Sequence, residues 1–193
     1  MVKQFIRALG VDDTSFQLRA DAYTGIVGAV YRGRGILEDV LTNIIEVDGL
    51  DSTEKIVEMI KGSKHLNQLR AIFLSGITFG GFNTVNIKEL YQVLKIPVIV
   101  ILEKKPDYER IKVAASRTKN YDRIITYIKE AGEVTPVQTS KGRIYIQLSG
   151  SNINNALKLI SLFQVNSKIP EPLRVAQLIA KIFKRENTLI KSS

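Results

Sequence analysis

The stretch from Ala71 to Ile87, AIFLSGITFGGFNTVNI, constrains the fold of this chain most strongly. It begins with a short apolar segment, 71–74, that predicts a buried strand. A loop follows that contains three glycines, Gly76, Gly80 and Gly81. Asn83 then predicts the start of a helix, because its short side chain can accept hydrogen bonds from first-turn N–H groups. Open α/β sheets bind ligands just past the carboxyl ends of their strands, so Ser75 is the first candidate for a functional side chain.

The other segments follow in an order that is typical of one α/β fold. Three strand-like runs come first, at 5–11, 22–31 and 36–47, and the glycines in Arg32-Gly33-Arg34-Gly35 predict a hairpin between the second and the third. A helix beginning near Asp51 or Ser52, the strand at 71–74, a second helix and an apolar strand at 98–102 come next. The order β-β-β-α-β-α-β predicts a ribonuclease H-like mixed sheet flanked by helices. Two charged helical segments within 103–133, a hairpin around 140–142 and helices ending near 163 and 185 complete the expected elements.

The charge is unevenly distributed along the chain. Residues 1–51 hold 5 basic and 8 acidic side chains, whereas residues 52–193 hold 23 and 11, so the net charges are −3 and +12. A metal-dependent enzyme acting on a polyanion needs both parts, because carboxylates hold the cation while lysines and arginines attract phosphates. The plainer interpretation is that the positive charge keeps the protein in solution.

Composition excludes several classes of protein. At 193 residues the chain is long enough for one domain with a substantial core, and we expect a single domain over 1–193. The absence of cysteine excludes disulfides and thiolate metal sites. No apolar run approaches the roughly 20 residues that span a bilayer, and the first residues do not resemble a signal peptide. We therefore expect a cytoplasmic protein with no membrane segment.

Acidic residues occupy two of the three positions where ribonuclease H-like folds hold divalent ions. Asp12 ends the first strand, and Asp51, with Asp48 as a substitute, precedes the first helix. Asp13 ranks below Asp12, because alternate side chains of a strand point to opposite faces. Carboxylate oxygens bind Mg²⁺ or Mn²⁺, which activate water and stabilise the leaving oxygen in phosphodiester hydrolysis. Ser75 occupies the third position, where a neutral hydroxyl is a poorer ligand than a carboxylate.

Each of these residues also has a structural interpretation. Asp12 and Asp13 can form a polar turn instead of a metal site. Asp51 can serve as an N-cap without binding metal, and Ser75 can simply start a tight turn. The predicted hairpin tip carries Arg32 and Arg34. These arginines can bind phosphates, or they can serve only to increase solubility. His65, the single histidine, is expected to be exposed to solvent in a loop. The glycine loop matches neither the Walker nor the Gly-x-Gly-x-x-Gly phosphate-binding pattern.

Four segments resemble an uncharacterised, mostly archaeal family related to endonuclease V, the repair nuclease that cuts near deaminated bases. They are GVDD at 10–13, VDGLDST at 47–53, SGITFGGFN at 75–83 and IPEPLRVA at 169–176. The resemblance implies that Asp12 matches the first metal aspartate, Asp51 approximately matches the metal glutamate, and Ser75 matches the second metal aspartate. The sequence departs from both relatives at Ser75, because Asp-Gly is the usual pair there, and the tyrosine-and-proline wedge of endonuclease V has no counterpart before Asp51.

Three functions follow as hypotheses. The first is a nucleic-acid-binding protein, acting on DNA or RNA, with endonuclease V-like ancestry and a degenerate divalent-metal site. The second is a Mg²⁺- or Mn²⁺-dependent endonuclease with Asp12 and Asp51 as ligands and Asp48 or Asp13 assisting. The third is a small-molecule-binding α/β protein that uses the loop at 75–83. The residues expected to contact a substrate are Gly76, Gly80, Gly81, Asn83, Arg32, Arg34 and Arg174.

Overall fold

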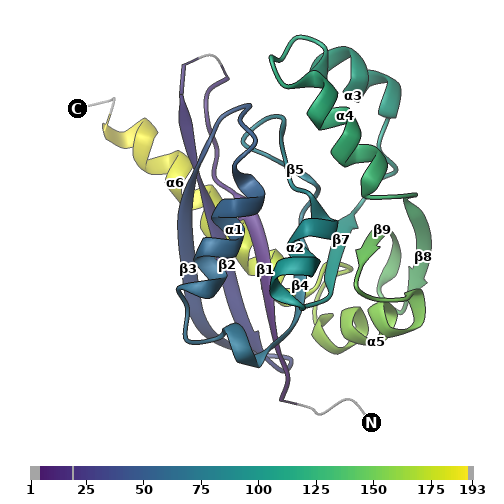
Figure 1. The fold of residues 1–193 in the computed structure, drawn as a ribbon. Coiled ribbons are helices and arrows are strands. Elements are labelled where there is room, and N and C mark those ends of the chain that lie inside the picture. The colour runs from purple at the N-terminus through teal and green to yellow at the C-terminus, as the bar shows by residue number, and fades with distance from the viewer. Residues whose placement is uncertain (1–4, 19, 191–193) are drawn as a thin grey trace.

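The structure, a computed structural model, describes residues 5–18 and 20–190, with side chains described as far as Phe183. Its centre is a seven-stranded mixed sheet in the order β3-β2-β1-β4-β7-β9-β8 (Figure 1). The strands are β1 (Arg7–Asp13), β2 (Tyr23–Arg32), β3 (Ile36–Glu46), β4 (Leu69–Leu74), β7 (Val98–Leu102), β8 (Thr135–Thr139) and β9 (Gly142–Ser149). A separate two-stranded hairpin consists of β5 (Thr78–Phe79) and β6 (Asn83–Thr84). The helices are α1 (Ser52–Lys61), α2 (Ile87–Leu94), α3 (Tyr108–Ala115), α4 (Tyr121–Glu130), α5 (Ile153–Phe163) and α6 (Glu171–Ile190), with a 3₁₀ turn at Leu66–Gln68.

The strand directions confirm the predicted ribonuclease H-like arrangement. β1, β2 and β3 are antiparallel neighbours, and β1, β4 and β7 run parallel. In the register of β1 with β4, Val11 lies beside Leu74. Asp12 and Ser75, the next residues of the two strands, are therefore placed side by side at the carboxyl edge of the sheet. This edge is at the top of the sheet in Figure 1, near the β5–β6 hairpin and the α3–α4 helix pair.

Two layers of helices cover the sheet. Leu9 and Val11 point into a core that also contains Ile56 of α1 and Leu90 of α2. Residues of the opposite face of the sheet pack with α5 and α6 in a second core, which includes Ala8, Phe73, Phe163, Leu173 and Ala176. Strand alternation produces this division, because successive side chains of β1 point to opposite faces.

Gly10 lets α6 lie directly on the sheet. A Cβ atom at this position would be only 2.2 Å from the backbone nitrogen of Leu173, so any larger residue would push the helix away. The close approach fixes the first turns of α6 against β1. It thereby holds the later turns of the same helix near the carboxyl end of β1.

The prediction that a helix starts near Asn83 is wrong. Residues 78–84 form the β5–β6 hairpin first, with Gly80 and Gly81 in left-handed conformations at its turn (φ 51° and 86°). The helix begins at Ile87, and the side chain of Asn86 accepts hydrogen bonds from the amides of Lys88 and Glu89. Asn83 and Asn86 can each cap a helix. The left-handed turn at Gly80 and Gly81 places Asn83 in a strand, so Asn86 caps the helix instead.

The expectation that His65 is exposed to solvent is also wrong. His65 is only 4% exposed, and its Nε2 lies 3.0 Å from Oδ2 of Asp39. Of the remaining predicted elements, α3 and α4 lie within 103–133, α5 ends at Phe163 as expected, and β8 and β9 form the expected hairpin, whereas α6 continues to Ile190. Across residues 5–18 and 20–190, no helix is long and apolar enough to cross a bilayer.

Candidate functional site

Asp12 and Ser75 form the centre of the candidate site. Ser75 follows the last residue of β4, and its backbone amide donates to the carbonyl of Val11, 3.3 Å away. This bond continues the β1–β4 ladder by one residue, so the two side chains project from adjacent positions. The hydroxyl of Ser75 donates a hydrogen bond to Oδ1 of Asp12. The sequence prediction placed both residues at this edge, and the structure brings them into contact.

Burial changes the electrostatics of Asp12. It raises the pKa of this carboxyl from 3.8 to about 6, because water is largely excluded from the charged form. The hydrogen bond from Ser75 acts in the opposite direction, while the neighbouring carboxylate of Asp13 raises the pKa further. The ammonium of Lys181 on α6 lowers it by a smaller amount. Asp12 is therefore ionised at neutral pH, but in surroundings that leave much of its charge uncompensated.

Asp13 faces away from Asp12, as strand alternation predicts. Its Oδ2 accepts a hydrogen bond of 2.7 Å from the amide of Gly80, in the loop that follows β4. Burial raises the pKa of Asp13, and this backbone hydrogen bond partly offsets the rise. The two neighbouring aspartates thus hold the two ends of one segment, because Asp12 contacts Ser75 at its start and Asp13 contacts Gly80 near its end.

Asp48 holds the glycine turn of the same loop. Its Oδ1 accepts a 2.8 Å hydrogen bond from the amide of Phe82, and its own amide donates to the carbonyl of Gly80 at 2.8 Å. Asp48 itself has a left-handed backbone (φ 55°), which is uncommon outside glycine and asparagine or aspartate. A Cβ on Gly81 would lie 2.3 Å from Oδ1 of Asp48, so the turn requires glycine there.

Asp51 precedes α1 but does not cap it with its side chain. Its Oδ1 accepts hydrogen bonds from Nδ2 of Asn83 (2.5 Å) and from the amide of Glu46 (3.2 Å). Asn83 is fully buried, and its Oδ1 accepts from the amide of Ser52 at 2.9 Å. Asn83 therefore satisfies the first turn of α1, although the sequence predicted that it would cap the helix after it.

The four predicted acidic ligands share one property. Each of them accepts a hydrogen bond from the 75–83 loop: Asp12 from Ser75, Asp13 from Gly80, Asp48 from Phe82 and Asp51 from Asn83. Within the part of the chain that the structure describes, no group of three or more His, Cys, Asp or Glu side chains is arranged to hold a metal ion. The acids thus fix the shape of the loop, and only Asp12 and Asp13 accompany Ser75 at the end of β1.

The donor set at the end of β1 nevertheless suits a hard divalent cation. Asp12 and Asp13 use one carboxylate oxygen each in the hydrogen bonds described above, and Ser75 supplies a hydroxyl. Mg²⁺ is commonly held by one or two carboxylates, with water and substrate phosphate as its other ligands. Asp12 and Ser75 project from adjacent strands and fit one such cation, with Asp12 as the principal ligand, whereas Asp13 projects from the other face of β1. The described residues do not assemble a comparable donor set for a second cation.

The predicted arginines differ in how far they are engaged. Arg32 pairs with Glu38 at 2.6 Å, and Arg174 makes three hydrogen bonds to the buried carboxylate of Glu171, at 2.6 to 3.0 Å. Arg34 lies at the exposed hairpin tip and has no ion pair with any described residue. Of the three guanidinium groups, Arg34 is the one most available to a phosphate.

Sequence reasoning missed Lys181, which supplies positive charge near Asp12. A signal was present in the predicted last helix. Arg174 and Lys181 are seven residues apart, which is close to two helical turns and places them on one side of that helix. The contact with β1 could not be inferred from this spacing, because it depends on the packing of α6 against Gly10.

Comparison with known proteins identifies the family. A profile of the family described as Endonuclease dU matches residues 4–183. The chain belongs to the endonuclease dU family. A UPF0215 protein of Methanothermobacter thermautotrophicus is 45% identical over 180 residues, which are 93% of this chain and 88% of that protein.

Solved structures share the fold of this chain. A protein of unknown function from Archaeoglobus fulgidus superposes with a TM-score of 0.82 at 39% identity, over 91% of this chain and 96% of that one. Endonuclease V of Ciona intestinalis, solved with a 24mer DNA that contains an inosine, superposes with a TM-score of 0.58 at 13% identity, over 98% and 89%. The chain therefore has the predicted endonuclease V-like, ribonuclease H-like fold.

Proposed function

We propose that this protein is a nucleic-acid-binding member of the endonuclease dU family whose metal-dependent chemistry is attenuated by Ser75. The observation that carries the proposal is the hydrogen bond from the Ser75 hydroxyl to Asp12. A neutral donor at this position partly compensates the charge of Asp12 without a cation. It also leaves two carboxylates, rather than three, at the end of β1.

The loss of one carboxylate weakens the attraction for a divalent ion. Removing a group that acts on the reacting atoms lowers enzymatic rates by orders of magnitude. A cation held at Asp12 would supply Lewis-acid stabilisation and an activated water. In the proposed site, Asp12 is the principal ligand and Ser75 orients it.

Nucleic acid as the partner is supported by charge and by the relatives. Outside residues 1–51 the chain carries a net charge of +12, which favours a polyanion. The family description refers to dU, and the endonuclease V of Ciona intestinalis was solved with inosine-containing DNA. We infer that the substrate class is a strand with a deaminated base, bound across the carboxyl ends of β1 and β4.

A fully active Mg²⁺- or Mn²⁺-dependent endonuclease is the second candidate. It is favoured by the raised pKa of Asp12, because a poorly solvated carboxylate that is ionised at neutral pH gains strongly from a cation. The two candidates differ in how much activity remains while the serine is present.

Binding and cleavage measured on the same samples separate these candidates. We expect wild type to bind a dU-containing oligonucleotide with an affinity that falls roughly a hundredfold or more between 50 and 200 mM salt. We expect no detectable cleavage by wild type in Mn²⁺, and measurable cleavage by Ser75→Asp. Ser161→Asp, an exposed serine on α5, is the matched control for the added charge. Wild-type cleavage as fast as that of Ser75→Asp would favour the second candidate, and salt-independent binding would contradict both.

A further inference from the structure

α6 has two apolar sides, and the sheet covers only one of them. The covered side packs on the sheet through Leu173 and Ala176, which are fully buried. On the other side of the helix, Leu178, Ile182 and Phe183 are 48%, 55% and 42% exposed. Figure 1 shows this half of α6, drawn in yellow, at the margin of the molecule beyond β2 and β3. A cluster of large exposed apolar residues indicates a surface that contacts another molecule.

The exposed side of α6 has the spacing of a helix that packs against another helix. Its apolar residues follow one another at intervals of three and four positions, at Val175, Leu178, Ile179, Ile182 and Phe183. This spacing keeps the side chains together along two turns of an α-helix. It is also the spacing with which two helices form an apolar seam. These five residues are called the α6 stripe below.

A hollow extends the α6 stripe onto the sheet. Its volume is about 620 Å³, and Phe183 lines it together with Tyr23 of β2 and Ile44 of β3. Tyr23 is 65% exposed and Ile44 is 61% exposed. Val40, which is 39% exposed, lies on the same face of β3 as Ile44, because alternate residues of a strand share a face. The apolar surface therefore continues from the helix across the outer strand of the sheet.

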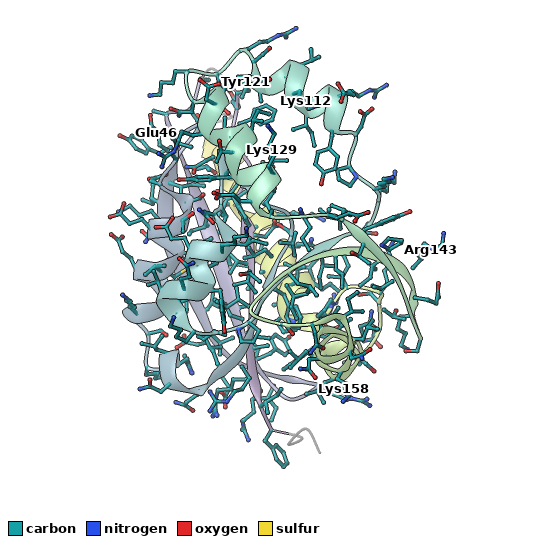
Figure 2. The ribbon with its side chains drawn as sticks, turned by 45° about the vertical axis from the view of Figure 1, so that its right-hand side comes forward. Glu46, Lys112, Tyr121, Lys129, Arg143 and Lys158 are labelled. Carbon is teal, nitrogen blue, oxygen red and sulfur yellow. The ribbon has the colours of Figure 1, made fainter. Side chains whose placement is uncertain are left out.

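The hollow does not suit a nucleic acid or an anionic membrane. Its described lining residues include one acid, Asp21, and no lysine or arginine. The basic side chains that Figure 2 labels belong to other elements, namely Lys112 on α3, Lys129 on α4, Arg143 on β9 and Lys158 on α5. Binding to phosphate groups depends on positive charge at the contact. The chemistry of the hollow therefore favours an apolar protein surface as its partner.

The exposed apolar area is that of a small specific interface. A large apolar side chain presents roughly 150–250 Å² when fully exposed, so the six exposed residues of the stripe and the hollow present roughly 600–700 Å² per copy. Contiguous apolar patches on monomeric proteins are usually at most about 300–600 Å². Covering this surface on two copies would bury roughly 1,200–1,400 Å² in total, which lies within the roughly 1,200–2,000 Å² of specific protein interfaces.

We propose that this chain forms a two-fold symmetric dimer in which the α6 stripe of each copy packs against that of the other. In a two-fold contact the same residues come from both copies, so a surface that is apolar throughout complements itself. Leu178 and Ile182 occupy the centre of the stripe and meet near the two-fold axis. The contact does not include Asp12 or Ser75, so the dimer is independent of the proposed function.

The dimer forms through the face of β3 rather than through its edge. β3 is the outermost strand on its side of the sheet, so an alternative dimer would pair the two β3 strands. Two amides of β3 are already satisfied by side chains of the same strand. The amide of Val40 donates to Oδ1 of Asp39, and the amide of Ile44 donates to Oδ1 of Asn43, both at 2.9 Å. Edge pairing would have to break these bonds, whereas contact through the face preserves them.

Sedimentation velocity of the full chain tests the proposal. An interface of this size predicts a dimer with a Kd of roughly 1–100 μM, measured over concentrations that bracket this range. The Kd should change little with salt, because the contact is apolar. Leu178→Glu and Ile182→Glu should each weaken the dimer roughly a hundredfold or more, because the axis brings two glutamates together in an apolar seam. Val113→Glu, at a 62% exposed position on α3, is the matched control and should keep the wild-type Kd.

Cross-linking locates the contact without a disruptive substitution. The chain contains no cysteine, so Ile182→Cys introduces a single reactive thiol per copy. A short bismaleimide should convert this variant to a covalent dimer, whereas the control Val113→Cys should remain monomeric on a denaturing gel. A wild type that is monomeric throughout the concentration range, or a dimer that persists in folded Leu178→Glu and Ile182→Glu, would overturn the inference. A monomeric wild type that binds anionic vesicles through the α6 stripe would assign this surface to a membrane and would also overturn it.

Discussion

Replacing Asp12 by asparagine should stabilise the protein at neutral and alkaline pH. The carboxylate of Asp12 is buried near the carboxylate of Asp13, and its pKa is raised from 3.8 to about 6. Asparagine removes the charge but keeps an oxygen that can accept the Ser75 hydroxyl. Functional residues are often unfavourable for stability, and Asp12 is expected to follow that pattern.

The magnitude and the pH range follow from this pKa. A difference of one in pKa corresponds to roughly 1.4 kcal/mol, so the rise from 3.8 to about 6 corresponds to about 3 kcal/mol. Between these two values the folded state binds more protons at Asp12 than the unfolded state does, so stability falls as pH increases through this range. Asp12→Asn should therefore gain roughly 2–3 kcal/mol at pH 8, where Asp12 is ionised, and little at pH 4.

Thermal unfolding without divalent metal provides the assay. For a chain of this length, roughly 2–3 kcal/mol corresponds to a Tm increase of about 5–10 °C at pH 8. Asp122→Asn, an exposed aspartate on α4, is the matched control and should change stability by less than about 1 kcal/mol. An equal effect of Asp12→Asn at pH 4 and pH 8, or a destabilisation at pH 8, would refute the argument that Asp12 carries a poorly compensated charge.

Two further variants test how the 75–83 loop is held. Asn83→Ala removes the buried amide that contacts Ser52, Glu46 and Asp51. In urea titration it should lower the free energy of unfolding by roughly 2–4 kcal/mol. A similar loss in the exposed control Asn154→Ala would contradict this role of Asn83. Gly81→Ala should lower it by roughly 2 kcal/mol or more, because the residue has φ 86° and its Cβ would meet Asp48 at 2.3 Å. The control Gly35→Ala has no atom within 4 Å of its added Cβ, and an equal effect of both substitutions would show that the Asp48 contact is unimportant.

Much of the fold could be predicted because local patterns and tertiary structure agree. Val98–Leu102 is apolar throughout and forms a central strand, and the hydrophobic spacing of Ile56, Met59 and Ile60 places one face of α1 in the core. The failures occur where a long-range contact decides. His65 is buried by its contact with Asp39, 26 positions earlier, and Asn83 caps a helix that begins 31 positions before it. Contacts between residues so far apart in the sequence leave no periodic pattern from which they could be predicted.

The candidate site could be predicted in part for the same reason. Asp12 lies near the end of β1 and Ser75 directly follows β4, and both strands were recognisable, so the proximity of the two residues follows from the topology. The loop contacts of Asp48 and Asp51 could not be inferred, because they depend on the turn at Gly80 and Gly81. The small-molecule role of this loop, the metal ligands and the predicted substrate contacts stay predictions.

Calorimetric titration of Mn²⁺ into wild type, Ser75→Asp and Asp12→Asn tests the central claim most directly. If Ser75 has replaced a metal-binding carboxylate, we expect no measurable binding by wild type or Asp12→Asn, and saturable binding by Ser75→Asp. Strong binding by wild type that is lost in Asp12→Asn would contradict attenuation and establish a working carboxylate site. Absence of binding in all three proteins would contradict the assignment of this edge of the sheet as an inherited metal site.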